Sequence, residues 1–356
     1  MKISRRLLAL TAALCAGVAL TGFGNFAFSQ ASAAAGSKKI CVSWRHFQEE
    51  RWRIDEAGIK SVVEPAGYEY ASADAQADPQ KQLTDVESLL ASGCAVAIIL
   101  AQDSKAVLPA LDRAKSENVP VIAYDAPIDS PDALFASFDN VAVGHLMAEA
   151  MVKARGDGNW VAIEGDASHP IVNIFRAGQM EVLQPLIDKG SIKIVAKQNI
   201  ENWKPDGAQS AMEQILTQQN NKVDAVLAMN DGTAGGVAAA LASQGLIGIP
   251  LSGQDGDKAA LNRIAKGQQT VTIWKNSYLL GQAAAKAAIE LADGKKPGEV
   301  AGVQITKTES GKDQPAILLA PIAITKDNLN AVIDAKWISK ADLCEGVSEN
   351  APAVCK

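Results

Sequence analysis

Short apolar runs alternate with amphipathic helical segments along most of the chain. In residues 78–93, for example, leucine and valine recur at helical spacing from Leu83 to Leu90, and Ser92-Gly93 then ends the pattern. Strands that are apolar throughout and separated by helices predict parallel sheets covered on both faces, and so an α/β fold. The expected strands are Lys39–Trp44, Ala95–Leu100, Val121–Tyr124, Trp160–Glu164, Ile192–Lys197, Ala225–Met229, Leu251–Gln254 and Thr270–Trp274.

The start of the chain has the three parts of a secretory signal. A basic segment (Lys2 to Arg6) precedes an apolar run (Leu7 to Leu20), and Ala31-Ser32-Ala33 supplies a small-residue cleavage pattern. The apolar run is short for a membrane anchor, and no later segment is apolar enough to span a bilayer. We therefore expect residues 1–33 to be a cleaved signal peptide, with Sec and twin-arginine export both open.

The length and net charge of the chain indicate how many domains it has and which classes of ligand it is not suited to bind. The chain has 356 residues and a formal net charge of −6, which becomes about −9 once the basic signal segment is removed. Nucleic-acid binding draws on clustered positive charge, so an acidic mature chain argues against it. The roughly 320 remaining residues exceed what one core comfortably holds, which predicts two domains.

Four cysteines follow the signal segment. None lies in a CxxC pair and the chain has only three histidines, so we expect neither a zinc site nor another metal or cofactor. Cys344 and Cys355 are placed to close a disulfide around the C-terminal tail in an oxidising compartment. Cys41 and Cys94, near the starts of two predicted strands, are either buried small side chains or a second bridge.

Polar or aromatic residues follow strand after strand in both halves of the chain. In open parallel sheets, ligands bind beyond the carboxyl ends of the strands. Indole rings pack on the C–H faces of sugars, and carboxylates, amides and cations bond to hydroxyl groups, which predicts a small polyhydroxylated ligand. Each residue alone has a structural alternative, since an Asp after a strand is often a helix N-cap.

Enzymatic readings find less support. The chain has no GxSxG, no GxxxxGK[ST] and no GxGxxG after the first strand, and no His, Asp and Glu cluster has metal-ligand spacing. A glycosidase needs only two carboxylates, for which Asp231 and Asp255 are the candidates. With no motif for catalysis, we expect a binding protein and not an enzyme.

Seven segments together resemble bacterial periplasmic xylose-binding proteins, which belong to the ribose/galactose-type solute receptors of ABC transporters. They are "ERWRID", "IAYDAPI", "FDNVAVG", "IFRAGQMEVLQPLID", "KVDAVLAMNDGTAGG", "SGQDGDKAALNRIAKGQQTVTIWK" and "LLAPIAITKDN", and the resemblance runs from about residue 38 to 328. It implies two Rossmann-like, doubly wound lobes that close on a monosaccharide, joined by crossings near Phe138-Asp139, Asn276 and Ala320-Pro321. The N-terminal lobe would comprise residues 38–138 and 277–320, and the C-terminal lobe residues 139–276 and 321–356.

The resemblance also implies which residues contact the sugar. Carried over one by one, these are Arg51, Trp52, Asp125, Arg176, Trp203, Asn230, Asp255 and Lys275. Trp52 and Trp203 would stack on opposite faces of the ring.

Two positions depart from the family pattern. Ala126 stands where an arginine is expected, and Ile171 where an asparagine is expected. Loss of polar contacts changes which ligand a site accepts, so a linear polyol, a deoxy sugar or a differently oriented pentose are alternatives to xylose. His46 is a candidate for a replacement contact, as are His169 and Asn173.

The resemblance implies a monomeric periplasmic receptor that delivers its ligand to an ABC permease and ATPase complex in the inner membrane. A receptor that also feeds a chemoreceptor would have the same pocket, so that alternative stays open. A sugar-responsive transcription regulator shares the two-domain core but would need an N-terminal helix-turn-helix, where this chain has a signal sequence.

Overall fold

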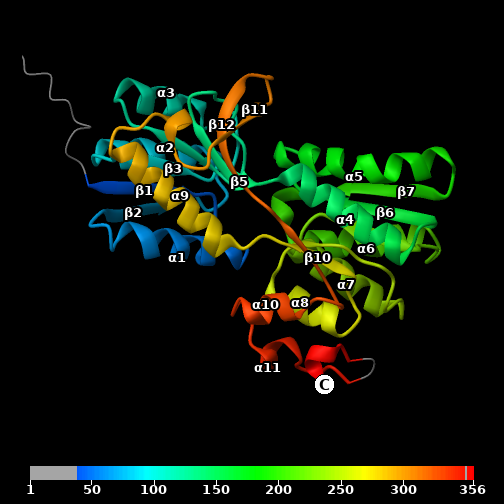
Figure 1. Ribbon diagram of the computed structural model, residues 1–356. Helices are drawn as coiled ribbons and strands as arrows, with labels where there is room; N and C mark the ends of the chain where they lie inside the picture. The colour runs from blue at the N-terminus through cyan, green and yellow to red at the C-terminus, as the bar shows by residue number, and fades with distance from the viewer. Residues whose placement is uncertain (1–37, 349–350) are drawn as a thin grey trace, which may run out of the picture. The chain divides into compact units, whose positions relative to one another are not determined.

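The computed structural model describes residues 38–348 and 351–356, so the predicted signal peptide lies outside the described residues. Its largest sheet has seven strands in the order β11-β12-β5-β4-β3-β1-β2 (Figure 1). Neighbouring strands are parallel except β11 and β12. The strands are β1 (Lys39–Trp44), β2 (Glu69–Asp74), β3 (Val96–Ile99), β4 (Val121–Tyr124), β5 (Leu134–Phe138), β11 (Gln304–Lys307) and β12 (Asp313–Leu319).

A second group of strands forms two three-stranded sheets, β7-β6-β8 and β13-β10-β9. A parallel bridge between Val226 and Leu251 links β8 to the segment that leads into β9. Strand β13 pairs antiparallel with β10, and the other pairs are parallel. The strands are β6 (Gly158–Glu164), β7 (Ile192–Asn199), β8 (Ala225–Ala228), β9 (Gln254–Asp255), β10 (Val271–Trp274) and β13 (Ile322–Thr325).

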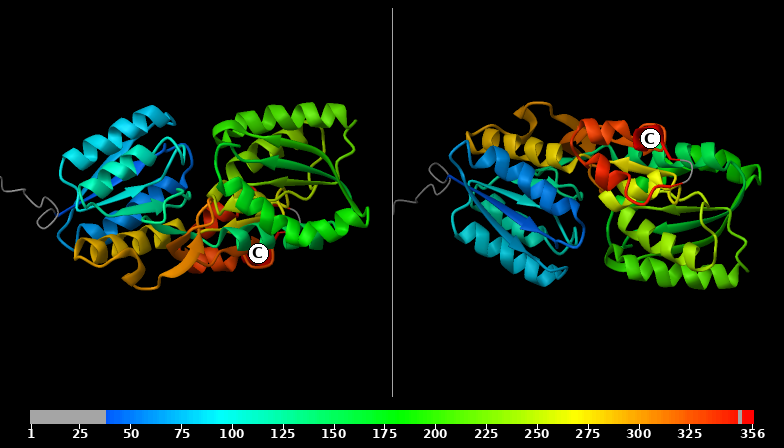
Figure 2. Two further views of the ribbon diagram at one scale, coloured as in Figure 1. Left: turned by 90° about the horizontal axis from the view of Figure 1, so that it is seen from above. Right: turned by 90° about the horizontal axis from the view of Figure 1, so that it is seen from below.

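Helices cover both faces of the seven-stranded sheet (Figure 2). On one face α1 (Arg51–Val63) and α9 (Ser277–Ala292) pack together over Ile40, Val42 and Trp44, and on the other α2 (Pro79–Ala91) and α3 (Leu108–Ser116) pack over Cys41. Successive residues of β1 thus face two different cores, which is why its buried residues are apolar except for Ser43. A disulfide joins Cys41 to Cys94 beside β3.

The second group of strands is covered in the same way. Helices α4 (Asn140–Ala154) and α5 (Ile171–Asp188) share a core with Trp160, while α6 (Pro205–Gln218) and α7 (Asp231–Ser243) share one with Val161. Helix α8 (Lys258–Ala265) packs with the C-terminal segment, which a Cys344–Cys355 disulfide closes. The remaining short elements are α10 (Asn330–Asp334), α11 (Lys340–Leu343), η1 (Glu201–Trp203), η2 (Pro297–Glu299) and η3 (Ala353–Cys355).

The predicted α/β class is confirmed, but the sheets are not wholly parallel. Strands β2, β5, β11, β12 and β13 were not among those expected, and β9 is shorter than the predicted Leu251–Gln254. Strands β2 and β11 lie at sheet edges and carry exposed polar residues, so they lack the continuous apolar run used to predict strands. Antiparallel edge strands are common on otherwise parallel sheets.

The chain passes three times between the two groups of strands. It does so from β5 into α4, from β10 into α9, and between β12 and β13 (Figure 1). Asp139 and Asn276 cap the helices that begin after the first two passages, accepting hydrogen bonds from Ala142 N (3.0 Å) and Leu279 N (3.2 Å). Within residues 38–348 and 351–356, no helix is long and apolar enough to cross a membrane.

Candidate functional site

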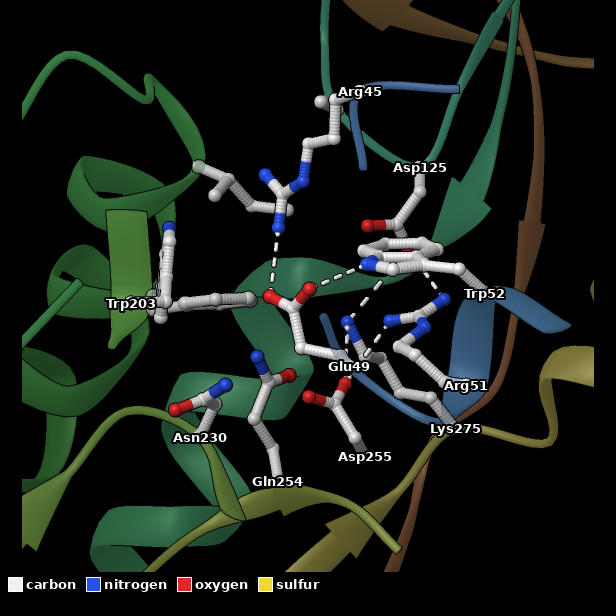
Figure 3. Close-up of a pocket in the computed structure, with 13 residues that line it drawn as sticks. Arg45, Glu49, Arg51, Trp52, Asp125, Trp203, Asn230, Gln254, Asp255 and Lys275 are labelled. Atoms are coloured by element: carbon white, nitrogen blue, oxygen red, sulfur yellow. Dashed lines mark hydrogen bonds and ion pairs between the residues drawn. The ribbon is translucent and has the colours of Figure 1, made fainter. Parts of the chain in front are cut away.

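A polar pocket lies between the carboxyl ends of strands from both groups (Figure 3). Its volume is about 30 Å³, whereas small-molecule sites usually have about 300–1,000 Å³. Side chains therefore fill most of the space that a ligand would need. The pocket is lined by Arg45, Glu49, Arg51, Trp52, Asp125, Ala126, Ile171, Phe175, Trp203, Asn230, Gln254, Asp255 and Lys275.

Three lining residues have an unusual backbone conformation. The φ angles of Asp125, Trp203 and Asp255 are 54°, 57° and 103°. Side chains other than glycine rarely adopt positive φ, and such residues gather at functional sites where the surroundings hold them in place. Here the turn after each strand aims a carboxylate or an indole ring into the pocket.

Arg51 is the centre of a buried network of charges. Its guanidinium donates to Asp255 Oδ1 (3.0 Å), Asp125 Oδ1 (2.9 Å) and Asp55 Oδ2 (3.3 Å). Lys275 Nζ lies 3.3 Å from Asp255 Oδ1 and 3.7 Å from Asp125 Oδ1. Arg51 and Lys275 are 2% and 1% exposed, so the network joins the two groups of strands in a medium that screens charge weakly.

Burial and the neighbouring positive charges shift the pKa values of these carboxyl groups in opposite directions. Burial would raise the pKa of Asp125, but the charges of Arg51 and Lys275 outweigh it and hold the pKa below the usual value. Behind the network, burial raises the pKa of Asp55 to about 7 despite Arg51 and a hydrogen bond from Tyr124. The pocket thus keeps Asp125 ionised near neutral pH, while burial favours the protonated form of Asp55.

Two indole rings border the pocket. The Arg51 guanidinium carbon lies 4.3 Å from the centre of the Trp52 ring, which fixes that ring by a cation–π contact. Trp203 is held through its ring face, because a Cβ on Gly165 would lie 2.0 Å from its Cη2 atom. Position 165 therefore has to be glycine for the Trp203 ring to lie where it does.

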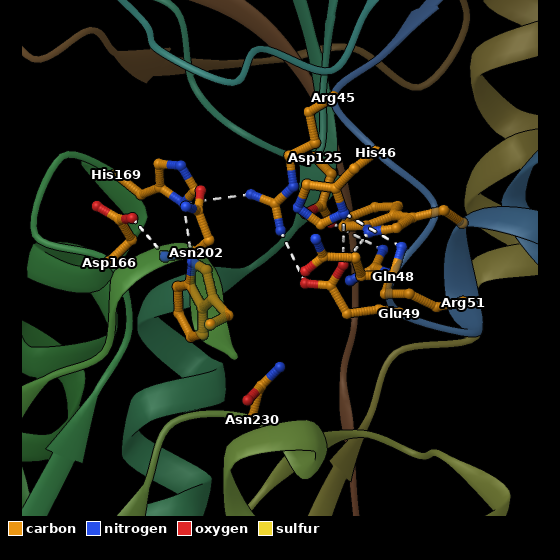
Figure 4. Close-up of polar contacts among 12 residues, drawn as sticks. Arg45, His46, Gln48, Glu49, Arg51, Asp125, Asp166, His169, Asn202 and Asn230 are labelled. Atoms are coloured by element: carbon orange, nitrogen blue, oxygen red, sulfur yellow. Dashed lines mark hydrogen bonds and ion pairs between the residues drawn. The ribbon is translucent and has the colours of Figure 1, made fainter. Parts of the chain in front are cut away.

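His169 connects the two groups of strands above the pocket (Figure 4). Its Nδ1 atom accepts from Arg45 Nη1 (3.2 Å) and from Trp203 Nε1 (2.8 Å). The Nε2–H therefore donates to the carbonyl of Gln102 (3.0 Å). Burial and the Arg45 charge lower the pKa of His169 to about 4, so the ring stays neutral near pH 7 and orients both Arg45 and Trp203.

The structure brings most of the predicted contact residues together. Those that line the pocket are Arg51, Trp52, Asp125, Trp203, Asn230, Asp255 and Lys275. Of these, Asn230 also caps α7, with Oδ1 accepting from Thr233 N at 2.9 Å. Arg176 and His46 are not among the lining residues.

Glu164, the last residue of β6, pairs with Arg176 and holds its side chain away from the pocket. Its Nε donates to Glu164 Oε1 at 2.8 Å and its Nη2 lies 2.5 Å from Oε2, while Nη1 donates to Asn173 Oδ1 at 2.9 Å. His46 is buried beside the pocket, with Nδ1 3.1 Å from Glu49 Oε2. His46 thus contacts Glu49, which lines the pocket, and its predicted direct contact with the ligand stays a prediction.

Four lining residues were not predicted: Arg45, Glu49, Phe175 and Gln254. Arg45 and Glu49 lie in the loop between β1 and α1, where no periodicity indicates the direction of a side chain. Arg45 brings a guanidinium to a pocket in which Ala126 replaces the expected arginine. Ala126 and Ile171 both line the pocket, so its wall is apolar at the two positions that depart from the family pattern.

Of the two carboxylates considered for glycoside hydrolysis, Asp255 lines the pocket and Asp231 does not. Asp231 accepts from Gly256 N (2.9 Å), Asp257 N (3.0 Å) and Thr272 Oγ1 (2.6 Å) and is not among the lining residues. Its carboxylate shapes the turn after β9. Across residues 38–348 and 351–356, no group of three or more His, Cys, Asp or Glu side chains is placed to hold a metal ion.

A pocket lined from the strand ends of two separate sheet systems is the arrangement of a solute-binding protein. A family model described as a periplasmic binding protein domain matches residues 40–296. The chain is 36% identical to the D-xylose-binding periplasmic protein of Escherichia coli (strain K12) over 318 residues, which cover 89% of this chain and 95% of that protein. The chain belongs to the periplasmic binding protein family, as the sequence resemblance predicts.

Solved structures agree with this assignment. A carbohydrate transporter solute-binding protein from Chloroflexus aurantiacus, in complex with D-glucose, is 30% identical, with a TM-score of 0.76 over 86% of this chain and 98% of that one. An ABC transporter solute-binding protein from Clostridium phytofermentans with bound β-D-glucose is 26% identical, with a TM-score of 0.78 over 86% and 99%. These similarities confirm the predicted fold.

Proposed function

We propose that this chain is the periplasmic receptor of an ABC transporter and captures a monosaccharide or a closely related polyol in the pocket. The relatives support this proposal, since one is named for D-xylose and two solved structures hold glucose. All three are named as binding proteins, so the chain is a carrier that performs no chemistry on its ligand.

One observation carries the assignment to a sugar-like ligand. The pocket combines two indole rings, Trp52 and Trp203, with a buried network of carboxylates and cations around Arg51. Rings provide faces for C–H groups, and charged groups that already hold fixed positions give strong, directional bonds to hydroxyls. A purely apolar ligand would leave those groups without partners, which is costly in a buried site.

Closure of two lobes is the mechanism we propose. The lobes are residues 38–138 with 277–320, and residues 139–276 with 321–356, and the three chain passages between them form the hinge. Direct bonds between the lobes, such as Arg51 to Asp255 (3.0 Å) and Gln102 Nε2 to Asn202 Oδ1 (3.0 Å), support a closed state. A ligand that contacts both lobes favours closure by its differential affinity for that state.

Export, partners and oligomeric state follow from the same proposal. After removal of residues 1–33, the mature chain would act in the periplasm and present its closed form to the permease. We propose a monomer, which size-exclusion chromatography with light scattering tests. A chemoreceptor as a further partner is tested by chemotaxis of a deletion strain toward the ligand.

The proposal is tested by a thermal-shift screen of the mature protein against pentoses, hexoses and polyols. A ligand that binds only the folded state raises the melting temperature by an amount that grows with its concentration relative to Kd. The ligand should be recovered unchanged after incubation. A screen in which no sugar, sugar derivative or polyol stabilises the protein would refute the receptor assignment.

A further inference from the structure

The Glu49 carboxylate occupies the space between the two indole rings of the pocket. Figure 3 shows it between Trp52 and Trp203. It accepts from Trp52 Nε1 (2.6 Å) and from Arg45 Nη2 (3.1 Å), and His46 Nδ1 lies 3.1 Å away. Because the remaining volume is about 30 Å³, a ligand can enter between the rings only if this carboxylate moves out.

The carboxylate of Glu49 is ionised. Burial would raise its pKa, but the Arg45 charge and bonds from His46 and Trp52 outweigh burial and lower the pKa to about 2. The pocket therefore already holds an anion at a position built from donors. The Glu49 carboxylate thus lies between the rings, with its oxygens against Arg45 and the indole N–H of Trp52.

Among the residues that line the pocket, positive and negative side chains are equal in number while Glu49 is inside, and Asp55 lies behind them as a further partner of Arg51. The lining residues include three cations, Arg45, Arg51 and Lys275, and three carboxylates, Glu49, Asp125 and Asp255. Asp125 and Asp255 both pair with Arg51 and Lys275. Departure of Glu49 would thus remove the carboxylate that pairs directly with Arg45, and only the more distant charge of Asp125 would still act on that guanidinium.

Arg45 is poorly placed to tolerate that loss. It is 6% exposed and its Nε–H has no hydrogen-bond partner, and its other contacts are uncharged: the ring of His169 at 3.2 Å and the Trp52 ring, whose centre lies 5.0 Å from the guanidinium carbon. A buried guanidinium without an anion is strongly unfavourable. A neutral ligand would supply hydroxyl oxygens but no charge, whereas a ligand carboxylate would restore both the charge and the hydrogen bonds.

We propose that the ligand is a sugar acid, a polyhydroxylated carboxylate whose anionic group replaces that of Glu49 against Arg45 and the indole N–H of Trp52. This inference rests on the proposed function and narrows its ligand class. The hydroxyls of the ligand would meet the charged network and Gln254, whose Oε1 is buried, lines the pocket and has no partner. An unpaired buried acceptor is suited to a hydroxyl donor.

The test is calorimetric titration of the mature protein with matched pairs of ligands. D-xylonate is compared with D-xylose and xylitol, and D-glucuronate with D-glucose. We expect an acid to bind at least about tenfold more tightly than its neutral counterparts, because hydrogen bonds between charged groups in buried sites are stronger than those between neutral groups. Arg45→Gln should weaken the acid by about 10- to 100-fold and the neutral ligands by much less.

A second variant removes the internal anion itself. Glu49→Gln keeps the shape of the side chain but leaves Arg45 unpaired, so the affinity for the acid should rise. The matched control is Glu117→Gln, which removes the same charge outside the pocket, where the side chain is 36% exposed and pairs with Arg113 of the same lobe at 2.9 Å. Exposed pairs contribute little, so this control should leave the affinities within about threefold.

The outcomes separate the inference from the function on which it rests. If neutral sugars bind more tightly than their acids, or if Arg45→Gln weakens both equally, the ligand is not a sugar acid but the receptor assignment stands. If Glu49→Gln leaves the affinity for the acid unchanged, Glu49 does not compete with it and the inference is wrong. Absence of binding by acids, sugars and polyols alike would overturn both proposals.

Discussion

Replacing Arg51 by methionine tests whether the buried charge network stabilises the fold as its geometry indicates. Arg51 donates to Asp55, Asp125 and Asp255 and is 2% exposed, and Lys275 would remain as a partner for the last two. Removing one side of a buried ion pair leaves an uncompensated charge and costs about 3–5 kcal/mol of unfolding free energy. Arg51→Met should therefore lose about that much at pH 8, measured by urea denaturation.

The loss of unfolding free energy in Arg51→Met should change with pH in a direction that can be stated in advance. In the wild type, Arg51 helps to hold the pKa of Asp125 below its usual value, which stabilises the fold above the pKa of the unfolded chain. Without Arg51, burial raises the folded-state pKa of the carboxyl groups, so protonation relieves the penalty and the deficit should be smaller at pH 5. Arg53→Met, on the exposed side of α1, is the control, and it should stay within about 1 kcal/mol of wild type because it loses only a cation–π contact with Phe47. An Arg51→Met deficit that matches the control, or that does not shrink at pH 5, would refute the reasoning.

Three further changes probe other parts of the site. Trp52→Ala should cost about 3–5 kcal/mol of stability yet keep a cooperative unfolding transition, and it should abolish stabilisation by ligand; an intact thermal shift would remove Trp52 from the site. Gly165→Ala places a Cβ 2.0 Å from the ring of Trp203 and should weaken ligand binding, measured by calorimetry. Gly298→Ala is its control, because no heavy atom lies within 4 Å of the added Cβ, and equal affinities in the two variants would contradict the packing argument. The raised pKa of Asp55, about 7, should lower stability as pH rises from about 4 to 7, and Asp55→Asn should flatten that slope in urea midpoints; an unchanged slope would assign it to another group.

The pocket residues that follow strands could be predicted because a parallel sheet brings the carboxyl ends of its strands together at one edge. Strand β1 was predicted at its observed bounds, Lys39–Trp44, since both its faces are buried and four of its six residues are apolar. Asp125 and Lys275 follow similar strands directly, so the rule that ligands bind beyond strand carboxyl ends placed them correctly in the pocket. A strand such as β11, at an edge and largely exposed, gives no such signal.

Contacts made by side chains in loops and on helices were less predictable. The family pattern predicts that Arg176 contacts the ligand, and in this structure its guanidinium pairs with Glu164, twelve residues earlier in the chain. Arg45 and Glu49 lie in a loop whose conformation depends on partners such as His169, more than a hundred residues away. Local sequence pattern carries no information on such long-range pairing. The position of the Glu49 carboxylate in the pocket was therefore apparent only from the structure.

A crystal structure of the mature protein with the ligand that stabilises it most would test the central claim directly. We predict density for a polyhydroxylated ligand between the rings of Trp52 and Trp203, in contact with Arg51 and Asp255, with the Glu49 carboxylate displaced from its place beside Arg45. A ligand bound elsewhere on the protein, with Glu49 still between the two rings, would contradict the account.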